Sequence, residues 1–198
     1  MEPWQFKQIE ALKKILTDDT IYIDIGACRG ELLSFLSTNC KYGYAVEPEP
    51  NNFLFLQQYF SRPDIQLINK IVSDISGPVK FFTHQTHMGN ILGHNMDYIP
   101  FKDYVYIESI TLDNFFKDKA IDFVKLDVEG AEWKVFEGAK NILEQRNIVW
   151  QVEFHLDEDW HLRNILYDYG YNIYSLDLKK LSKDSPRPYQ GIVSKNDF

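Results

Sequence analysis

The sequence predicts an α/β fold in which helices cover both faces of a doubly wound, mostly parallel sheet. Short apolar segments typical of strands alternate with amphipathic segments over most of the 198 residues, as in successive βαβ units. Glycine-containing turns follow two of the predicted strands, at residues 26–30 and at residue 130. No internal repeat or interdomain linker interrupts the alternation, so we expect residues 1–198 to form a single domain.

In the first half of the chain, apolar residues at helical spacing predict an N-terminal helix within residues 1–16. A second helix is expected directly after the glycine turn at 26–30. A third is expected over 51–60, with Asn51 as its N-cap. The strands predicted between these helices cover residues 21–25, 42–48 and 65–73.

The middle of the chain predicts a β-hairpin insertion, formed by residues 79–84 and 104–112. The polar segment 84–100 between them would be a loop, either a lid that shapes the acceptor site or an inert connection. After the insertion the alternation resumes, with helices predicted over 131–143 and 157–170. The later strands are expected at 121–130, 148–155 and 171–178, followed by an antiparallel last strand at 189–195.

The composition excludes several classes of protein. The formal net charge is −8, which disfavours a general binder of nucleic-acid phosphates. Cys28 and Cys40 form neither a disulfide framework nor a metal-binding spacing. The N-terminus has no apolar signal segment, and no apolar run approaches the ~20 residues needed to span a bilayer. We therefore predict a soluble cytoplasmic protein without a membrane or nucleic-acid partner.

The first glycine turn, in the segment IYIDIGACRG, combines a carboxylate with two glycines. It is not the dinucleotide-binding pattern G-x-G-x-x-G, because Cys28 occupies the middle glycine position. Gly26 would let the backbone leave the strand, and Gly30 would let the next helix approach the sheet. Asp24 at the strand end suits a ligand that presents an ammonium group. The alternative is an ordinary turn in which Asp24 caps the helix.

A second acid, Glu47, ends the second predicted strand 23 residues after Asp24. An acid at this place, about 20 residues past a glycine loop, can accept hydrogen bonds from both hydroxyls of a ribose. Pro48 would turn the chain and offer an apolar surface to an adenine. The alternative is a surface glutamate before a proline turn.

Four segments of the sequence resemble the FkbM-type family of S-adenosylmethionine-dependent methyltransferases. The segments DIGACRG and AVEPEPNNFLFL are similar to the family's glycine loop and its E-P-x-P segment. The most specific match is ITLDNFFKDKAIDFVKLDVEGAEWKVFEGA, and VEFH resembles a late strand of the family. The resemblance extends from Ile21 to His155. The chain departs from the family at Cys28, where Asn is common, and over residues 84–95.

The resemblance implies a class I methyltransferase with a Rossmann-like fold and assigns roles to residues. The loop Gly26–Gly30, which includes Ala27, would hold the methionine part of S-adenosylmethionine, with Asp24 near its ammonium group. Glu47, followed by Pro48, would bind the ribose. The backbone around Ile71 would meet the adenine, and Asp127 would lie where the methyl group is transferred and S-adenosylhomocysteine is formed.

The reaction itself predicts catalytic residues at the ends of two later strands. An alcohol that accepts a methyl group must lose a proton, which a general base promotes. The candidates are Asp127, Glu153 and His155. We expect His155 to be the base, because an unperturbed imidazole titrates near neutrality, and Asp127 to orient the acceptor. His155 could instead be a structural histidine.

The acids near these candidates allow two other interpretations. Glu129 and Glu132 fit a capping role at the next helix, so neither is placed in the active set. Asp127, Glu153 and His155 could also hold a divalent metal, and His84 and His87 in the loop strengthen that possibility. However, the H-x-x-H spacing of the two loop histidines, with no third ligand fixed by spacing, is weak evidence, so the sequence does not favour a metal.

The predicted function is thus O-methylation of a hydroxyl on a sugar or another small molecule. The preference for sugars and for oxygen comes from the resemblance alone. Two alternatives remain: a nicotinamide-dependent oxidoreductase on a similar sheet, and a non-catalytic domain that keeps the cofactor fold. Residues after His161 are expected to complete the sheet without taking part in the chemistry.

Overall fold

The computed structural model describes residues 3–83, 89–93, 103–145, 147–155 and 160–198. Most of the predicted lid loop, 84–100, lies outside these ranges, including His84 and His87. Within the described part of the chain, no helix combines the length and the apolar character needed to cross a bilayer.

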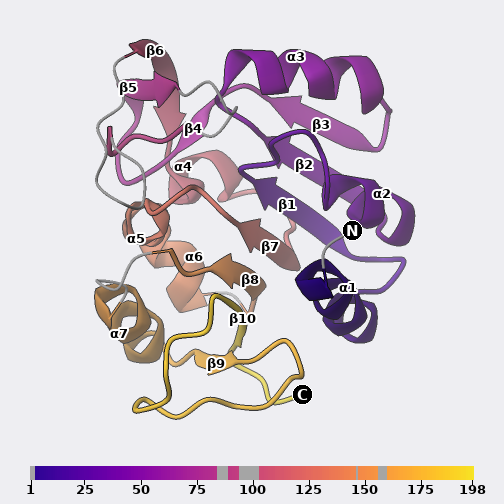
Figure 1. The fold of residues 1–198 in the computed structure, drawn as a ribbon, viewed down its shortest axis with the longest axis vertical. Coiled ribbons are helices and arrows are strands. Elements are labelled where there is room, and N and C mark those ends of the chain that lie inside the picture. Colours follow the sequence, from indigo (N-terminus) through magenta and orange to yellow (C-terminus); the bar gives the residue numbers. More distant parts are fainter. Residues whose placement is uncertain (1–2, 84–88, 94–102, 146, 156–159) are drawn as a thin grey trace.

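The main sheet has seven strands in the order β3-β2-β1-β7-β8-β10-β9 (Figure 1). Every neighbouring pair from β3 to β8 is parallel, and β10 is antiparallel to both β8 and β9. The predicted doubly wound sheet with an antiparallel last strand is therefore confirmed. Its strands are β1 (Ile21–Ile25), β2 (Tyr42–Val46), β3 (Ile65–Ile68), β7 (Phe123–Leu126), β8 (Val149–Glu153), β9 (Asn172–Tyr174) and β10 (Gln190–Ser194).

Helices cover both faces of this sheet, which explains why its central strands are apolar on both sides. On β1, Tyr22 packs in a cluster with residues of α1, α2 and α3, whereas Ile23 packs with residues of α4 to α7. The helices are α1 (Pro3–Ile15), α2 (Leu33–Asn39), α3 (Pro50–Tyr59), α4 (Leu112–Phe116), α5 (Glu132–Glu137), α6 (Lys140–Gln145) and α7 (Trp160–Asp168).

The hairpin insertion belongs to a second, three-stranded sheet beside β3 and α3, far from β9 in the view of Figure 1. The predicted antiparallel pair is confirmed as β5 (Gly77–Thr83) and β6 (Asp103–Ile110). The prediction of one strand over 65–73 is wrong, because the chain passes from β3 into β4 (Ile71–Val72), which pairs in parallel with β6. Between them, the Asn69 side chain donates to the carbonyl oxygens of Glu47 and Pro48.

Three local predictions are wrong for identifiable reasons. The helix predicted over 131–143 is divided into α5 and α6, and Gly138 lies between them, packed so closely on Ser73 that a Cβ atom would lie 2.1 Å from its carbonyl oxygen. The helix after β2 is capped by Glu49, whose side chain accepts from the Asn52 amide, so Asn51 lies inside the helix. Pro50 occupies the first turn, where its missing N–H is not needed. The strand predicted over 104–112 ends at Ile110, and Thr111 caps the unpredicted helix α4.

Candidate active site

The strand order reverses beside β1 and β7, and two adjoining cavities lie at the carboxyl ends of these central strands. Ligands of doubly wound sheets bind at such a reversal. The first cavity is lined by Gly26, Glu47, Pro48, Ile71 and Asp127 among others. The second is lined by Asp24, Gly26, Ala27, Asp127 and Glu153 among others. Neither Gly30 nor His155 is among the described residues that line these two cavities, although His155 lies 3.7 Å from both Asp127 and Glu153.

Glu47 is held at the rim of the first cavity by two backbone amides. Its Oε2 accepts from the N–H of Cys28 at 2.7 Å, and its Oε1 accepts from the N–H of Glu49 at 2.9 Å. The Asn52 side chain is a further hydrogen-bond partner of this carboxylate. Burial raises the pKa of Glu47 to about 7, although the two amide hydrogen bonds oppose this rise.

The glycine loop also explains why Asn suits position 28. Cys28 has a φ of +48° and so occupies the left-handed region, which Asn tolerates better than most other residues. This conformation directs the Cys28 amide toward Glu47. Gly30, with a φ of +84°, faces the ring of Phe60, which a Cβ atom would approach to 2.4 Å.

Gly26 lets the ends of β1 and β7 meet. It has a φ of +75°, and a Cβ atom at this position would lie 1.8 Å from the carbonyl oxygen of Asp127. The Asp127 amide in turn donates to the Ile25 carbonyl oxygen at 3.1 Å. The two predicted segments, around Asp24 and Asp127, are thus joined backbone to backbone.

Lys125, which the sequence interpretation missed, connects the acids of these two strands. Its Nζ lies 3.3 Å from Asp24 Oδ1 and 3.4 Å from Asp127 Oδ2, and it donates to the Gly26 carbonyl oxygen at 2.6 Å. Burial would lower the pKa of Lys125, but the surrounding carboxylates outweigh it and raise that pKa. The signal in the sequence was a lysine within the otherwise apolar strand FVKL. Asp24 therefore already has a cationic partner.

His155 lies among four carboxylates. Its Nδ1 is 3.0 Å from Glu132 Oε1, and its Nε2 is 3.7 Å from Asp127 Oδ1, 3.8 Å from Glu129 Oε2 and 3.7 Å from Glu153 Oε1. Although burial lowers the pKa of His155, Glu132 and the other carboxylates raise it to about 9. These surroundings thus hold the pKa of His155 above the unperturbed value on which its choice as the base rested.

Glu132, which the sequence interpretation assigned to helix capping, also contacts His155. It is fully buried, and besides the contact with His155 its Oε1 accepts from the amides of Val128 at 3.0 Å and Gly130 at 3.2 Å. The N-cap residue of α5, Ala131, makes no side-chain capping bond. The side chain of Glu132 thus fixes the turn after Asp127 and the orientation of His155 together.

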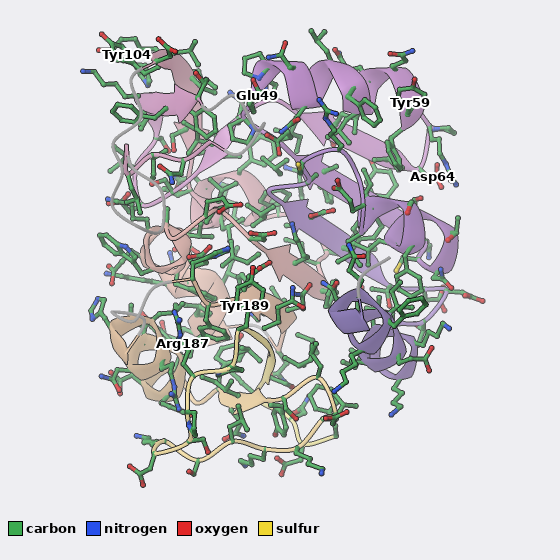
Figure 2. The ribbon with its side chains drawn as sticks, in the orientation of Figure 1. Glu49, Tyr59, Asp64, Tyr104, Arg187 and Tyr189 are labelled. Carbon is green, nitrogen blue, oxygen red and sulfur yellow. The ribbon has the colours of Figure 1, made fainter. Side chains whose placement is uncertain are left out.

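Glu153 is tied to residues near the C-terminus, which were expected to take no part in the chemistry. Burial, with a further contribution from Asp127, raises the pKa of Glu153 to about 7, and a hydrogen bond from Tyr189 opposes the rise. Gln190 Nε2 donates to Glu153 Oε2 at 3.4 Å. The Tyr189 ring, labelled in Figure 2, has its centroid 6.0 Å from that of His155. The antiparallel pairing of β10 with β8 brings these side chains together.

Three solved structures share this fold. The FkbM methyltransferase from Methylobacillus flagellatus KT has a TM-score of 0.59 at 18% identity; the match covers 90% of this chain and 44% of that chain, so the present chain spans less than half of it. An rRNA methylase from Streptococcus thermophilus gives a TM-score of 0.55 at 14% identity, and the match covers 98% of this chain and 97% of that chain. SMU.1697c from Streptococcus mutans, in complex with S-adenosylhomocysteine, gives a TM-score of 0.53 at 14% identity, and the match covers 98% of each chain.

The sequence itself also matches a family model. A search of curated proteins found no match, but the model described as "Methyltransferase FkbM domain" matches residues 24–173. This range contains the glycine loop, Glu47, the turn Asp127–Glu132 and His155. The resemblance found in the sequence is thereby confirmed: the chain belongs to the FkbM methyltransferase family.

Proposed function

We propose that the protein is an S-adenosylmethionine-dependent O-methyltransferase that acts on a hydroxyl of a sugar or another small molecule. The observation that carries the cofactor assignment is the position of Glu47. Two backbone amides orient this buried carboxylate beside a cavity whose other walls include Val46, Ile71 and Val72. A ribose diol facing the carboxylate and an adenine against the apolar wall fit this arrangement, because such sites combine apolar walls with a few placed polar groups.

The second cavity would receive the methionine end of the cofactor and the acceptor. It is continuous with the first through Gly26, Cys28, Asp127 and Glu129, which line both cavities. Ala27 belongs to this wall, and Asp24 would approach the ammonium group from it. The described part of the predicted lid, residues 89–93, supports the proposed role of segment 84–100, because Gly89, Asn90 and Ile91 line the first cavity.

Methyl transfer requires alignment and the removal of one proton. When bound, S-adenosylmethionine supplies a methyl carbon to which an acceptor oxygen can bond while the carbon–sulfur bond breaks and its electron pair stays on sulfur. Asp127, Glu153 and His155 would hold the acceptor hydroxyl in line with the carbon–sulfur bond, with its oxygen about 3–3.5 Å from the methyl carbon. The proton of that hydroxyl would pass to a carboxylate of this group.

The acceptor class rests on charge and on the family. The second cavity is lined by five carboxylates and by the cation of Lys125. The carboxylates belong to Asp24, Glu31, Asp127, Glu129 and Glu153. Such a wall disfavours a phosphate-rich acceptor. Some structures of similar fold are named as rRNA or tRNA methylases, so RNA belongs among the acceptors to be screened.

Calorimetric titration with S-adenosylhomocysteine tests the cofactor assignment. We expect micromolar binding to the wild-type chain and at least a hundredfold weaker binding to Glu47→Ala, because the oriented acceptor of the ribose is lost. Glu137→Ala, which removes an acid from a surface ion pair with Lys140, should bind like the wild type. If the wild type does not bind, the methyltransferase proposal is overturned.

The raised pKa of Glu47 predicts a pH-dependent affinity. With a pKa of about 7, Glu47 is mostly ionised at pH 8 and about nine-tenths protonated at pH 6. Since the ionised form accepts hydrogen bonds from the ribose, the dissociation constant of S-adenosylhomocysteine should rise roughly tenfold from pH 8 to pH 6. Titrations of the wild type and of Glu47→Gln measure this. An equally steep profile in the variant would assign the effect to other groups.

A further inference from the structure

We propose that Asp127, Glu153 and His155 form a binding site for one divalent transition-metal ion, next to the place where the acceptor hydroxyl would lie. Two neighbouring parallel strands bring these residues together. Asp127 directly follows β7, Glu153 ends β8, and His155 lies two residues further on. One potential ligand atom of each residue lies within 4.8 Å of the others.

The separations suit a shared ion better than direct hydrogen bonds. His155 Nε2 lies 3.7 Å from both Asp127 Oδ1 and Glu153 Oε1, which exceeds the ~3.2 Å limit of a good N–H···O bond. Two ligands that each lie about 2.0–2.2 Å from a metal are separated by roughly 3–4.3 Å. Among the described residues, Nε2 has no hydrogen-bond acceptor, although the His155 side chain is only 4% exposed.

The orientation of the imidazole is a separate observation that favours a metal. Glu132 binds Nδ1 at 3.0 Å and is itself fixed by the amides of Val128 and Gly130. A metal-binding histidine almost always has its other ring nitrogen bonded to a carboxylate or carbonyl, which directs the free nitrogen at the ion. Gln190 and Tyr189 similarly hold Glu153, whose Oε1 lies 3.7 Å from His155 Nε2.

The local charge is also suited to a cation. Asp127, Glu129, Glu132 and Glu153 surround His155, and Lys125 lies 3.4 Å from Asp127. His155 must release its Nε2 proton to bind the ion. With a neutral imidazole, the four carboxylates and Lys125 carry a net charge of −3 if all the carboxylates are ionised. One imidazole with two carboxylates favours Mn²⁺ or Zn²⁺ over Mg²⁺, which prefers ligands that are all oxygen.

The metal site would add a catalytic role to the proposed function. Only that catalytic role rests on the proposed function. Three protein ligands leave coordination positions open, as in catalytic metal sites. A hydroxyl bound at an open position would lose its proton more readily, because the ion stabilises the alkoxide. Metal binding itself can be measured without any cofactor.

The test is calorimetric titration of the chelator-treated full chain with MnCl₂ and with ZnCl₂, supported by electron paramagnetic resonance of bound Mn²⁺. We expect one site with a micromolar dissociation constant for Mn²⁺, tighter binding of Zn²⁺, and competition between the two. Glu153→Gln and His155→Gln should each weaken binding at least tenfold. Glu132→Gln, which removes no ligand, should weaken it 10- to 100-fold. Glu137→Gln is the matched control and should leave binding unchanged.

Two results would overturn the proposal: no stoichiometric binding of either ion below millimolar concentration, or equal binding by the ligand variants, with circular dichroism confirming that they fold. Tight, equal binding of Mg²⁺ would overturn the choice of a transition metal. Titration of the metal-free chain with S-adenosylhomocysteine separates the two proposals. If the chain binds S-adenosylhomocysteine but no metal, only the proposed metal site is overturned. If it binds metal but not S-adenosylhomocysteine, only the methyltransferase proposal is overturned.

Discussion

Gly26→Ala is expected to unfold the protein at a temperature lower by roughly 10 °C and to abolish binding of S-adenosylhomocysteine. The added Cβ would lie 1.8 Å from the Asp127 carbonyl oxygen, and φ is +75°. Because the obstacle is backbone at the junction of β1 and β7, neither strand can yield without breaking the Asp127–Ile25 hydrogen bond. A loss of about 3–5 kcal/mol follows, which for a chain of this size corresponds to that shift in melting temperature.

Gly170→Ala is the matched control for this substitution. Gly170 has a nearly identical φ of +79°, but nothing lies within 4 Å of the position that its Cβ would take. It should therefore show only the conformational cost of about 1–2 kcal/mol. Thermal denaturation of both variants isolates the steric contribution. Equal losses would show that the close approach of Gly26 to Asp127 does not limit stability.

Lys125→Met is expected to reduce the free energy of unfolding by about 3–5 kcal/mol. The substitution keeps much of the side-chain volume but leaves Asp24 and Asp127 without their shared cation, and Asp24 is only 1% exposed. Removing one partner of a buried ion pair is costly because the remaining charge stays in a poorly solvated place. Urea denaturation at neutral pH measures the loss.

A double substitution distinguishes lost charge compensation from lost packing. Adding Asp24→Asn to Lys125→Met should recover about 1–3 kcal/mol relative to the sum of the single changes, because the buried charge is then removed as well. Lys134→Met, at a more exposed lysine that lies 3.6 Å from Asp74, should cost less than about 1 kcal/mol. If the losses in the free energy of unfolding caused by Asp24→Asn and Lys125→Met were strictly additive, an electrostatic role for Lys125 would be contradicted.

The fold was predictable because its signals are local. Apolar alternation, glycine turns and the order of strands and helices can each be recognised within short segments of the chain. In addition, parallel strands place their carboxyl ends at one edge of a sheet. This was enough to bring Gly26, Glu47, Ile71 and Asp127 to one cavity. The division of segment 65–73 was not predictable in this way, because it depends on pairing with β6, about 40 residues later.

The electrostatics of the site could not be derived from the sequence. Whether His155 is neutral or cationic depends on the carboxylates that the fold places around it, and Glu132, which looked like a helix-capping residue, lies 3.0 Å from its Nδ1. Tyr189 and Gln190 reach Glu153 only because β10 is inserted antiparallel between β8 and β9.

The sequence by itself thus determined the α/β class, the family and the edge of the sheet where acids gather, since each depends on short patterns along the chain. Only the tertiary structure decided which acid has which partner: Asp24 with Lys125, Glu47 with two loop amides, His155 with Glu132. The physical reason is that burial and charge act through space over a few ångströms, and most of these partners are 19 to 101 residues apart in the chain.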